Sequence, residues 1–474
     1  MSRKRKEHPV IENVLIEDIA AEGKALSHID GKVVFVPFVV PGDVVDIRVL
    51  KSKKTYCEAK AVALKKFSEK RVDAKCPHFG VCGGCKWQML EYTSQLETKQ
   101  KLVKETLEHL GNVKSNEMRP ICGSEKIFHY RNKLEYTFST RAWIDNPQEN
   151  TPSTNNGALG FHISGLFDKV LDIKSCLLQD ELSNTIRLFV RNYAIANNLP
   201  FYDIRNHTGY LRNLVVRNNS AGEWMLIVIV ADDWPDQLVP LLTALRDNFP
   251  QVTSLHYIIN NKLNDSYADL KAHLFAGNPY LEERMTTYRK DGFLRFRINP
   301  KSFYQTNSEQ AHRLYRYVAE FADLRDNDTV YDLYTGTGTI AQFVAPMCNR
   351  VIGIEYVNEA IDDAKANAYL NRLNNTSFFA GDMAEILTED FINAHGKPDI
   401  VITDPPRAGM HEKVIRQLIA AAPRKIIYVS CNPATQARDI KLMSEFYDPA
   451  RIQPVDMFPH THHVENIVEL VRKK

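Results

Sequence analysis

The chain has 474 residues, of which 44% are hydrophobic and 25% charged, and its formal net charge is only +2. These values exclude a fibrous or intrinsically disordered protein, and the length predicts two or three domains. The most apolar stretch, residues 33–40, is too short to cross a bilayer and contains Pro37, and the basic start has no apolar core like that of a secretory signal. We therefore expect a cytoplasmic protein without a membrane segment.

Short apolar runs separated by turn residues fill residues 10–64, as in Gly31-Lys-Val-Val-Phe-Val. The pattern predicts five strands in a small closed β-barrel, a shape that often binds nucleic acid. From Lys51 to Arg71 the chain adds six further lysines against two glutamates. Alone, such a run indicates a solvated surface, but beside such a barrel it indicates contacts to RNA phosphates. The segment resembles a TRAM domain, an RNA-binding module.

The remaining chain divides into two further regions. Mixed strands and helices over residues 69–290 indicate an α+β domain, with a helix near residues 91–112 that we expect to pack on the C-terminal domain. In residues 291–474, buried strands alternate with helices, which predicts a Rossmann-like parallel sheet. Together with residues 1–68 as the β-barrel, these regions make a multidomain α/β protein.

Residues that follow the predicted parallel strands suit a nucleoside cofactor. The first strand ends in Asp332-Leu-Tyr-Thr-Gly-Thr-Gly-Thr-Ile, where Gly336 and Gly338 let a ligand approach the backbone. Glu355 follows the second strand and suits a ribose diol, and Asp382 follows the third and suits an adenine. Neither a Walker loop nor a full Gly-x-Gly-x-x-Gly motif is present. The pattern favours S-adenosylmethionine over a nucleotide.

Two reactive side chains follow the next two strands. Asp404 begins Asp-Pro-Pro-Arg-Ala-Gly, and Cys431 lies in Ser-Cys-Asn-Pro, where a helix N-terminus favours the thiolate. A thiolate that adds to carbon 6 of uracil makes carbon 5 nucleophilic enough to accept a methyl group. A base must then remove the hydrogen on carbon 5, and Glu465 near the C-terminus is our candidate.

The chain resembles, over essentially its whole length, the RNA uracil-C5 methyltransferase family, which modifies bacterial 23S ribosomal RNA and the thymine loop of transfer RNA. The resemblance lies in the Asp332, Asp404 and Cys431 motifs, the terminal His-Val-Glu465, and Phe303-Tyr-Gln-Thr-Asn. It implies that Cys431 is the nucleophile and Glu465 the base, with Phe303 near a flipped base. It also implies contacts to the methyl donor or the uracil from Gln305, Tyr334, Glu355 and Asp404. We expect Gly336, Gly338, Thr339 and Asp382 at the cofactor as well, although some relatives carry asparagine at positions 339 and 382.

Four cysteines form a separate candidate site. Cys76, Cys82 and Cys85 surround a Gly-rich turn, and Cys176 could supply a fourth thiolate. Four thiolates suit a [4Fe-4S] cluster or zinc, although the lack of a second close Cys-x-x-Cys pair weighs against a zinc ribbon. Family members with an N-terminal TRAM module carry a [4Fe-4S] cluster on this pattern, so the resemblance favours the cluster.

The expected substrate is a uridine that leaves its stack in a folded RNA. The TRAM-like segment and the cysteines favour 23S ribosomal RNA by resemblance, with transfer RNA as the alternative, and we expect a monomer. Three other classes stay open: a cytosine-C5 methyltransferase, an amino-group methyltransferase of the Asp-Pro-Pro type, and a non-catalytic iron-sulfur RNA-binding protein. The first commonly uses a second cysteine, the second usually has an aromatic residue where this chain has Arg407, and the third needs neither Cys431 nor Glu465.

Overall fold

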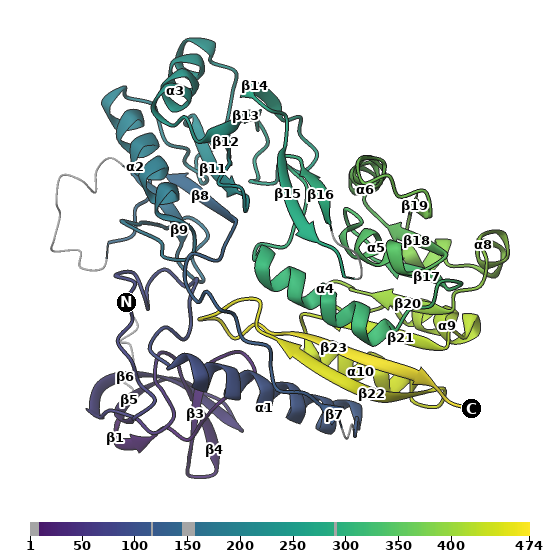
Figure 1. The fold of residues 1–474 in the computed structure, drawn as a ribbon. Coiled ribbons are helices and arrows are strands. Elements are labelled where there is room, and N and C mark those ends of the chain that lie inside the picture. The colour runs from purple at the N-terminus through teal and green to yellow at the C-terminus, as the bar shows by residue number, and fades with distance from the viewer. Residues whose placement is uncertain (1–8, 115–116, 145–156, 289–291) are drawn as a thin grey trace.

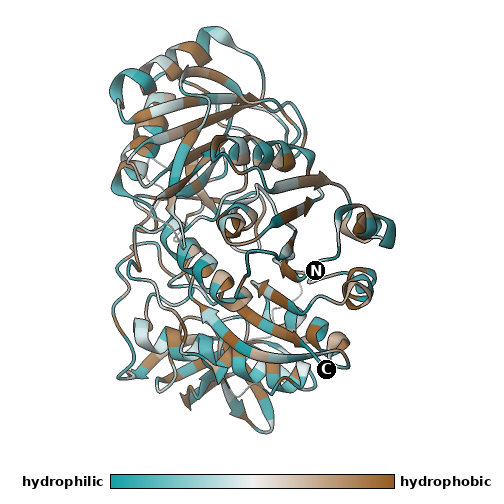
Figure 2. Cartoon of the chain, turned by 45° about the vertical axis from the view of Figure 1, so that its right-hand side comes forward, coloured by the Kyte–Doolittle hydropathy of each residue, from teal (hydrophilic) through white to brown (hydrophobic). Residues whose placement is uncertain are grey.

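The computed structural model describes residues 9–114, 117–144, 157–288 and 292–474, which form three large sheets and one separate hairpin (Figure 1). The basic start of the chain lies outside these ranges. Within them, no helix has both the length and the apolar composition that a bilayer crossing requires. Figure 2 shows apolar residues recurring along the strands of the sheets. The expected multidomain α/β class is confirmed.

The N-terminal sheet wraps around one apolar core. Its strands are β1 (Val10–Leu15), β2 (Asp18–Ile19), β3 (Ala25–Ile29), β4 (Lys32–Val36), β5 (Val44–Ser52) and β6 (Tyr56–Lys66). The strand order is β1-β5-β6-β4-β3-β2. Alternate side chains such as Val34 and Val36, or Val45 and Ile47, are buried in this core because successive residues of a strand point to opposite faces. The expected β module is confirmed, with one strand more than predicted because residues 18–19 pair with β3.

The central domain is a seven-stranded sheet with helices on one face. Its elements are β8 (Lys133–Ser139), β9 (Ala158–His162), β10 (Val170–Asp172), α2 (Glu181–Ala196), β11 (Leu211–Asn218), β12 (Trp224–Val230), α3 (Pro235–Asn248), β13 (Val252–Ile259) and β14 (His273–Gly277). The order is β10-β9-β8-β11-β12-β13-β14, and β12 and β13 run parallel with α3 as their crossover. Ile186 of α2 and Leu241 of α3 share a core with Leu214 and Leu226 of the sheet. The hairpin β15 (Leu281–Thr286) and β16 (Phe293–Ile298) leads to the C-terminal domain.

The C-terminal domain is built on an eight-stranded sheet. Its strands are β7 (Glu117–Met118), β17 (Thr329–Leu333), β18 (Arg350–Glu355), β19 (Thr376–Ala380), β20 (Ile400–Thr403), β21 (Lys425–Ser430), β22 (Tyr447–Val455) and β23 (Glu465–Arg472). The order is β19-β18-β17-β20-β21-β23-β22-β7, with β17 to β21 parallel and β23 antiparallel to its neighbours. The order reverses between β17 and β20, and a ligand crevice is therefore expected at the carboxyl ends of these strands.

Helices cover both faces of this sheet. They are α1 (Tyr92–Gly111), α4 (Ser308–Ala322), α5 (Thr339–Val344), the short 3-10 helix η2 (Ala345–Met347), α6 (Asn358–Leu370), α7 (Met383–Ile386), α8 (Glu389–His395), α9 (Glu412–Ala421) and α10 (Pro433–Met443). Ile427 and Val429 of β21 pack with α4 and α5 on one face, whereas Ile426 and Tyr428 pack with α9 and α10 on the other. Helix α1, which precedes the central domain in the chain, packs on α10 (Figure 1).

Candidate active site

The turn between β17 and α5 exposes backbone to the crevice. Gly336 and Gly338 adopt φ values of +55° and +74°, in the left-handed region that favours glycine. A Cβ on Gly338 would lie 2.9 Å from side-chain atoms of Ala364 and Phe378. A Cβ on Gly336 would meet no atom of the described chain within 4 Å. Close packing therefore requires the second glycine, while the first leaves room beside the turn for a ligand.

Three polar side chains at the ends of β17, β18 and β19 face this turn. Glu355 accepts a hydrogen bond from the backbone N–H of Gly336 (3.2 Å). Tyr334 has a left-handed φ of 62°, and burial, followed by the carboxylates of Asp439, Asp382 and Glu355, raises its pKa to about 12. The structure thus brings together Tyr334, Glu355 and Asp382, as the sequence predicted for the carboxyl ends of adjacent strands.

Asp332, at the end of β17, keeps one acceptor atom free. One carboxyl oxygen accepts hydrogen bonds from the Thr335 hydroxyl and from the backbone N–H of Ala341. Its other oxygen, Oδ1, is buried and receives no hydrogen bond from the residues that the structure describes. Burial raises the pKa of Asp332 to about 7, and the nearby Asp404 carboxylate adds to this shift. The base of the turn therefore has an unused polar atom, which suits a polar ligand.

Thr339 and Asp382 also have partners within the chain. The Thr339 hydroxyl lies 3.0 Å from the hydroxyl of Tyr315. The Asp382 carboxylate accepts a hydrogen bond from the backbone N–H of Ala384 (2.8 Å) and so caps helix α7. Both residues lie where the sequence predicted them, and both have a structural role besides any contact to a cofactor.

The loop between β16 and α4 is attached to the central domain. Asn132 donates from its side chain to the carbonyl of Gln305 (2.9 Å) and from its backbone to the carbonyl of Thr306 (2.8 Å). Phe303 is 67% exposed, and its backbone carbonyl accepts a hydrogen bond from the hydroxyl of Thr337 in the glycine turn (3.5 Å). The loop therefore holds an exposed aromatic ring beside the glycine turn.

Cys431 lies between the end of β21 and the start of α10. Asn432 caps this helix by accepting from the backbone N–H of Ala434 (3.1 Å). The Asn432 side chain also donates to the carbonyl of Arg407 (3.0 Å), as does the hydroxyl of Thr435 (3.2 Å). These bonds fix the loops after β20 and β21 to each other, with the thiol between them.

The electrostatic surroundings of Cys431 differ from the sequence-based expectation. We expected the helix N-terminus to favour the thiolate, but burial and the carboxylates of Glu465 and Asp404 raise the pKa of the thiol to about 11. The guanidinium of Arg407 acts in the opposite direction. Without ligand, the thiol is therefore protonated at neutral pH, and attack on a substrate requires a base to accept its proton.

A buried carboxyl group, that of Glu465, and a partly exposed one, that of Asp404, share the site with this thiol. Glu465 is the first residue of β23 and is 7% exposed; burial and then the Asp404 carboxylate raise its pKa well above the ordinary range. Burial also raises the pKa of Asp404, after β20, to about 7. Because the two carboxyls and the Cys431 thiol perturb one another, the site holds protons that it can exchange.

Sequence reasoning missed two residues of this site. Arg407 is the cation that opposes the acidic groups around Cys431 and Glu465, and its place directly after Asp404-Pro-Pro was the available signal. Asn132 anchors the Gln305 loop from 173 residues away. No local pattern marks that contact, because it depends on how two domains pack.

The four cysteines of the second candidate site border one cavity. The cavity has a volume of about 340 Å³, and its lining includes Cys76, Cys82, Cys85, Cys176 and Arg131. Among the described residues, no group of three or more His, Cys, Asp or Glu side chains has the spacing that a single metal ion requires. The four thiols that the sequence groups together therefore line one cavity.

Comparison with known proteins identifies the family of the chain. Residues 267–473 match the family model described as tRNA (Uracil-5-)-methyltransferase, and residues 10–62 match the TRAM domain. An RNA methyltransferase of Bacteroides thetaiotaomicron is 52% identical over 457 residues, which cover 95% of this chain and 99% of that protein. An RNA methyltransferase of Chlorobaculum tepidum is 40% identical over 442 residues, 90% of this chain and 89% of that protein.

A solved structure is similar over nearly the whole chain. The crystal structure of the Pyrococcus abyssi tRNA (uracil-54, C5)-methyltransferase in complex with S-adenosyl-L-homocysteine has a TM-score of 0.74 and 28% identity, and it covers 97% of this chain and 100% of its own. The present protein is thus an RNA methyltransferase that uses S-adenosylmethionine. It belongs to the RNA uracil-C5 methyltransferase family, as its motifs predicted.

Proposed function

We propose that the enzyme methylates carbon 5 of a uridine in 23S ribosomal RNA, with Cys431 as nucleophile and Glu465 as base. The observation that supports this proposal is the convergence of the Cys431 thiol with the carboxyls of Glu465 and Asp404 at the ends of three strands, next to the glycine turn. The exposed ring of Phe303 suits a flipped base, which can stack on it.

The reaction needs both a thiol and a base. Cys431 gives its proton to the Asp404 carboxylate, which leaves the Glu465 carboxylate free for the later proton removal. The Cys431 sulfur bonds to carbon 6 of the uracil, which makes the ring an enolate that is nucleophilic at carbon 5. S-adenosylmethionine supplies an electrophilic methyl group to that carbon. Glu465 then removes the hydrogen from carbon 5, the ring double bond re-forms, and the bond from carbon 6 to sulfur breaks. The thiolate leaves and regains a proton from the site.

We assign the cofactor contacts to residues at the ends of the parallel strands. In our proposal, the backbone at Gly336 and Gly338 lies against the methyl donor, Glu355 binds its ribose and Asp382 lies near its adenine. The other expected contacts to the donor or the uracil come from Gln305, Tyr334, Thr339 and Asp404. The open side of Gly336 and the unpaired Oδ1 atom of Asp332 support a polar ligand at this turn.

We choose ribosomal RNA as the proposed substrate because of the domains and cysteines that the chain contains. An N-terminal TRAM module together with four clustered cysteines favours ribosomal RNA by resemblance, and we propose a cytoplasmic monomer with open faces for the folded RNA. A uridine of transfer RNA is the second candidate, because the matching family model and the Pyrococcus abyssi structure are both described as tRNA uracil methyltransferases.

We propose a [4Fe-4S] cluster at Cys76, Cys82, Cys85 and Cys176. The cavity that the four thiols share supports a common ligand there, and the resemblance favours a [4Fe-4S] cluster over zinc. Anaerobically purified protein should contain about four irons per chain, and Cys82→Ser should lose them. One zinc per chain and no iron would overturn the assignment.

The test of the main proposal is tritium release from RNA labelled at carbon 5 of uridine, with ribosomal or transfer RNA as substrate. The native enzyme should release tritium from 23S ribosomal RNA, and Cys431→Ala should not. The control is Cys348→Ala, which removes a buried thiol elsewhere in the same domain and should keep activity.

Other outcomes identify the alternatives. Release from transfer RNA alone would make transfer RNA the substrate. Release from label on cytidine would indicate a cytosine enzyme. Methyl transfer without tritium release would indicate an amino-group methyltransferase. RNA binding without any methyl transfer would indicate the binding-only alternative.

A further inference from the structure

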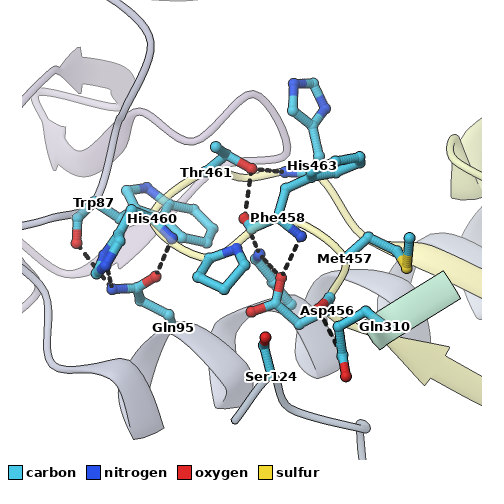
Figure 3. Close-up of polar contacts among 12 residues, drawn as sticks. Trp87, Gln95, Ser124, Gln310, Asp456, Met457, Phe458, His460, Thr461 and His463 are labelled. Carbon is cyan, nitrogen blue, oxygen red and sulfur yellow. Dashed lines mark hydrogen bonds and ion pairs between the residues drawn. The ribbon is translucent and has the colours of Figure 1, made fainter. Parts of the chain in front are cut away.

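The connection from β22 to β23 contains a segment whose successive carbonyls are all bonded. We call residues 456–460 the carbonyl-held segment; it lies in the loop that leads to Glu465 (Figure 3). The carbonyl of Asp456 accepts a hydrogen bond from Gln310 (2.9 Å), and that of Met457 accepts one from Asn307 (3.0 Å). The carbonyl of Phe458 accepts from Lys99 (3.1 Å), and that of Pro459 accepts from Tyr130 (3.1 Å). The carbonyl of His460 accepts from the backbone N–H groups of Lys86 (2.8 Å) and Trp87 (3.0 Å). These donors belong to α4, α1, the start of the central domain and the chain just after Cys85.

A buried ion pair anchors the start of this segment. The ammonium of Lys99 lies 2.5 Å from the carboxylate of Asp456, and both side chains are fully buried. The hydroxyl of Tyr92 donates to the same carboxylate (2.8 Å), and so does the backbone N–H of Phe458 (3.1 Å). Desolvation makes a buried ion pair costly, so such a pair contributes more to fixed geometry than to net stability.

His460 is fixed at the other end of the segment. Its φ of 66° lies in the left-handed region, which a residue with a side chain adopts only when its surroundings enforce it. Gln95 accepts a hydrogen bond from its backbone N–H (2.9 Å) and lies 3.2 Å from its ring Nδ1. Burial lowers the pKa of the imidazole to about 4, so the ring is neutral, and it packs on Phe128 with ring centroids 4.4 Å apart.

We propose that the carbonyl-held segment positions the carboxyl of Glu465 for proton removal, and that Tyr130, Gln95 and Lys99 are positioning residues. This inference rests on the proposed function of Glu465 as base. Residues 456–464 form no helix or strand and close the loop between Val455 and Glu465, which pair with each other at the ends of β22 and β23, so the bonds to this loop help to fix that end of the strand pair. Proton transfer is sensitive to the position of the base, whereas the thiol that forms the covalent bond lies on a different connection, after β21.

The test compares two isosteric variants. Tyr130→Phe removes one hydroxyl that donates to the carbonyl of Pro459. Tyr447→Phe is the matched control, because it removes a buried hydroxyl that donates to the carbonyl of Pro423 (2.9 Å), at the far end of the β22–β23 pair. The measurements are tritium release and the fraction of enzyme bound to RNA as a covalent adduct that resists detergent.

Loss of positioning should slow proton removal and so trap the methylated adduct. Tyr130→Phe should lower tritium release roughly fivefold, as expected for the removal of one hydrogen bond, and raise the adduct fraction. Gln95→Met should lower tritium release and raise the adduct fraction by more, since it removes two contacts to His460 and also the hydrogen bonds to the carbonyls of Trp87 and Leu90. Tyr447→Phe should match the native enzyme.

Two results would overturn the inference. In one, Tyr130→Phe lowers adduct formation and tritium release equally. In the other, Tyr130→Phe changes neither quantity. Glu465→Gln separates this failure from that of the proposed function. If Glu465→Gln traps adduct but Tyr130→Phe and Gln95→Met do not, Glu465 is the base and the segment does not position it. If Glu465→Gln traps no adduct while turnover continues, the base itself is wrongly assigned.

Discussion

The Cys431 thiol lies in surroundings that oppose its ionisation. Burial, Glu465 and Asp404 together raise its pKa to about 11, and the nearby Arg407 only partly offsets them. Such a thiol is inert at neutral pH until a substrate and a proton acceptor are both present. For the proposed nucleophile, this arrangement limits reaction in the absence of substrate.

Alkylation as a function of pH tests this electrostatic description. The rate at which iodoacetamide modifies Cys431, measured by mass spectrometry of the peptide that contains it, should rise with pH with a midpoint near pH 11. Glu465→Gln should lower the midpoint by roughly one unit, because removal of a like charge favours the thiolate, and Arg407→Met should raise it. Cys348, whose pKa burial raises to about 12, is the internal control and should not respond to either variant. A native midpoint below pH 9 would contradict the argument.

At the scale of elements, the β17–α5 turn combines two glycines with different roles. Gly338 has no space for a side chain, whereas Gly336 adjoins open space. Both have positive φ, so alanine at either position costs about 1 kcal/mol of stability through backbone strain. Beyond that, only alanine at position 338 forces its neighbours apart.

A pair of variants separates these roles. Gly338→Ala should lower the free energy of unfolding by a further ~1–2 kcal/mol through overpacking. Gly336→Ala should cost only the backbone strain and should also lower affinity for S-adenosylhomocysteine about tenfold, because its methyl group would occupy the proposed ligand space. Calorimetric titration and urea unfolding of both variants provide the check. If both variants lost the same affinity for S-adenosylhomocysteine and had the same free energy of unfolding, the two glycines would not have different roles.

Elements with strong patterns could be predicted from the sequence, and others could not. The strands before Asp404 and Cys431 are short apolar runs of the kind that parallel sheets bury, so their ends, and with them the site, were predictable. Strand β7, the two residues Glu117–Met118, pairs with β22 and carries no pattern of its own. So short a strand forms because the completed sheet offers it an edge.

At the scale of the whole molecule, the site draws on parts of the chain far apart in sequence. Lys99 on α1 has the sequence context of a surface charge, yet it is fully buried against Asp456, 357 residues later. Such a contact follows from the packing of α1 on α10 and not from any local signal. The sequence therefore carries a local signal for the candidate reactive groups but none for a contact such as this one.

The whole molecule must also hold RNA with little net charge. With +2 overall, general attraction is weak, so local basic surfaces must supply the phosphate contacts. Lys53 and Lys54 lie exposed in the turn between β5 and β6 of the TRAM domain. Such a turn presents two cations without disturbing the sheet.

Charge reversal at this turn should therefore weaken RNA binding without affecting the site. Lys53→Glu with Lys54→Glu should lower RNA affinity at low salt, and the slope of log affinity against log salt should become shallower by about 0.7 for each phosphate that the variant no longer neutralises. Filter binding between about 50 and 200 mM salt measures this slope. Affinity for S-adenosylhomocysteine is the control and should not change, because the β17–α5 turn, where we propose that the cofactor binds, lies in another domain. Unchanged RNA affinity and slope across that range would exclude these lysines from the RNA interface.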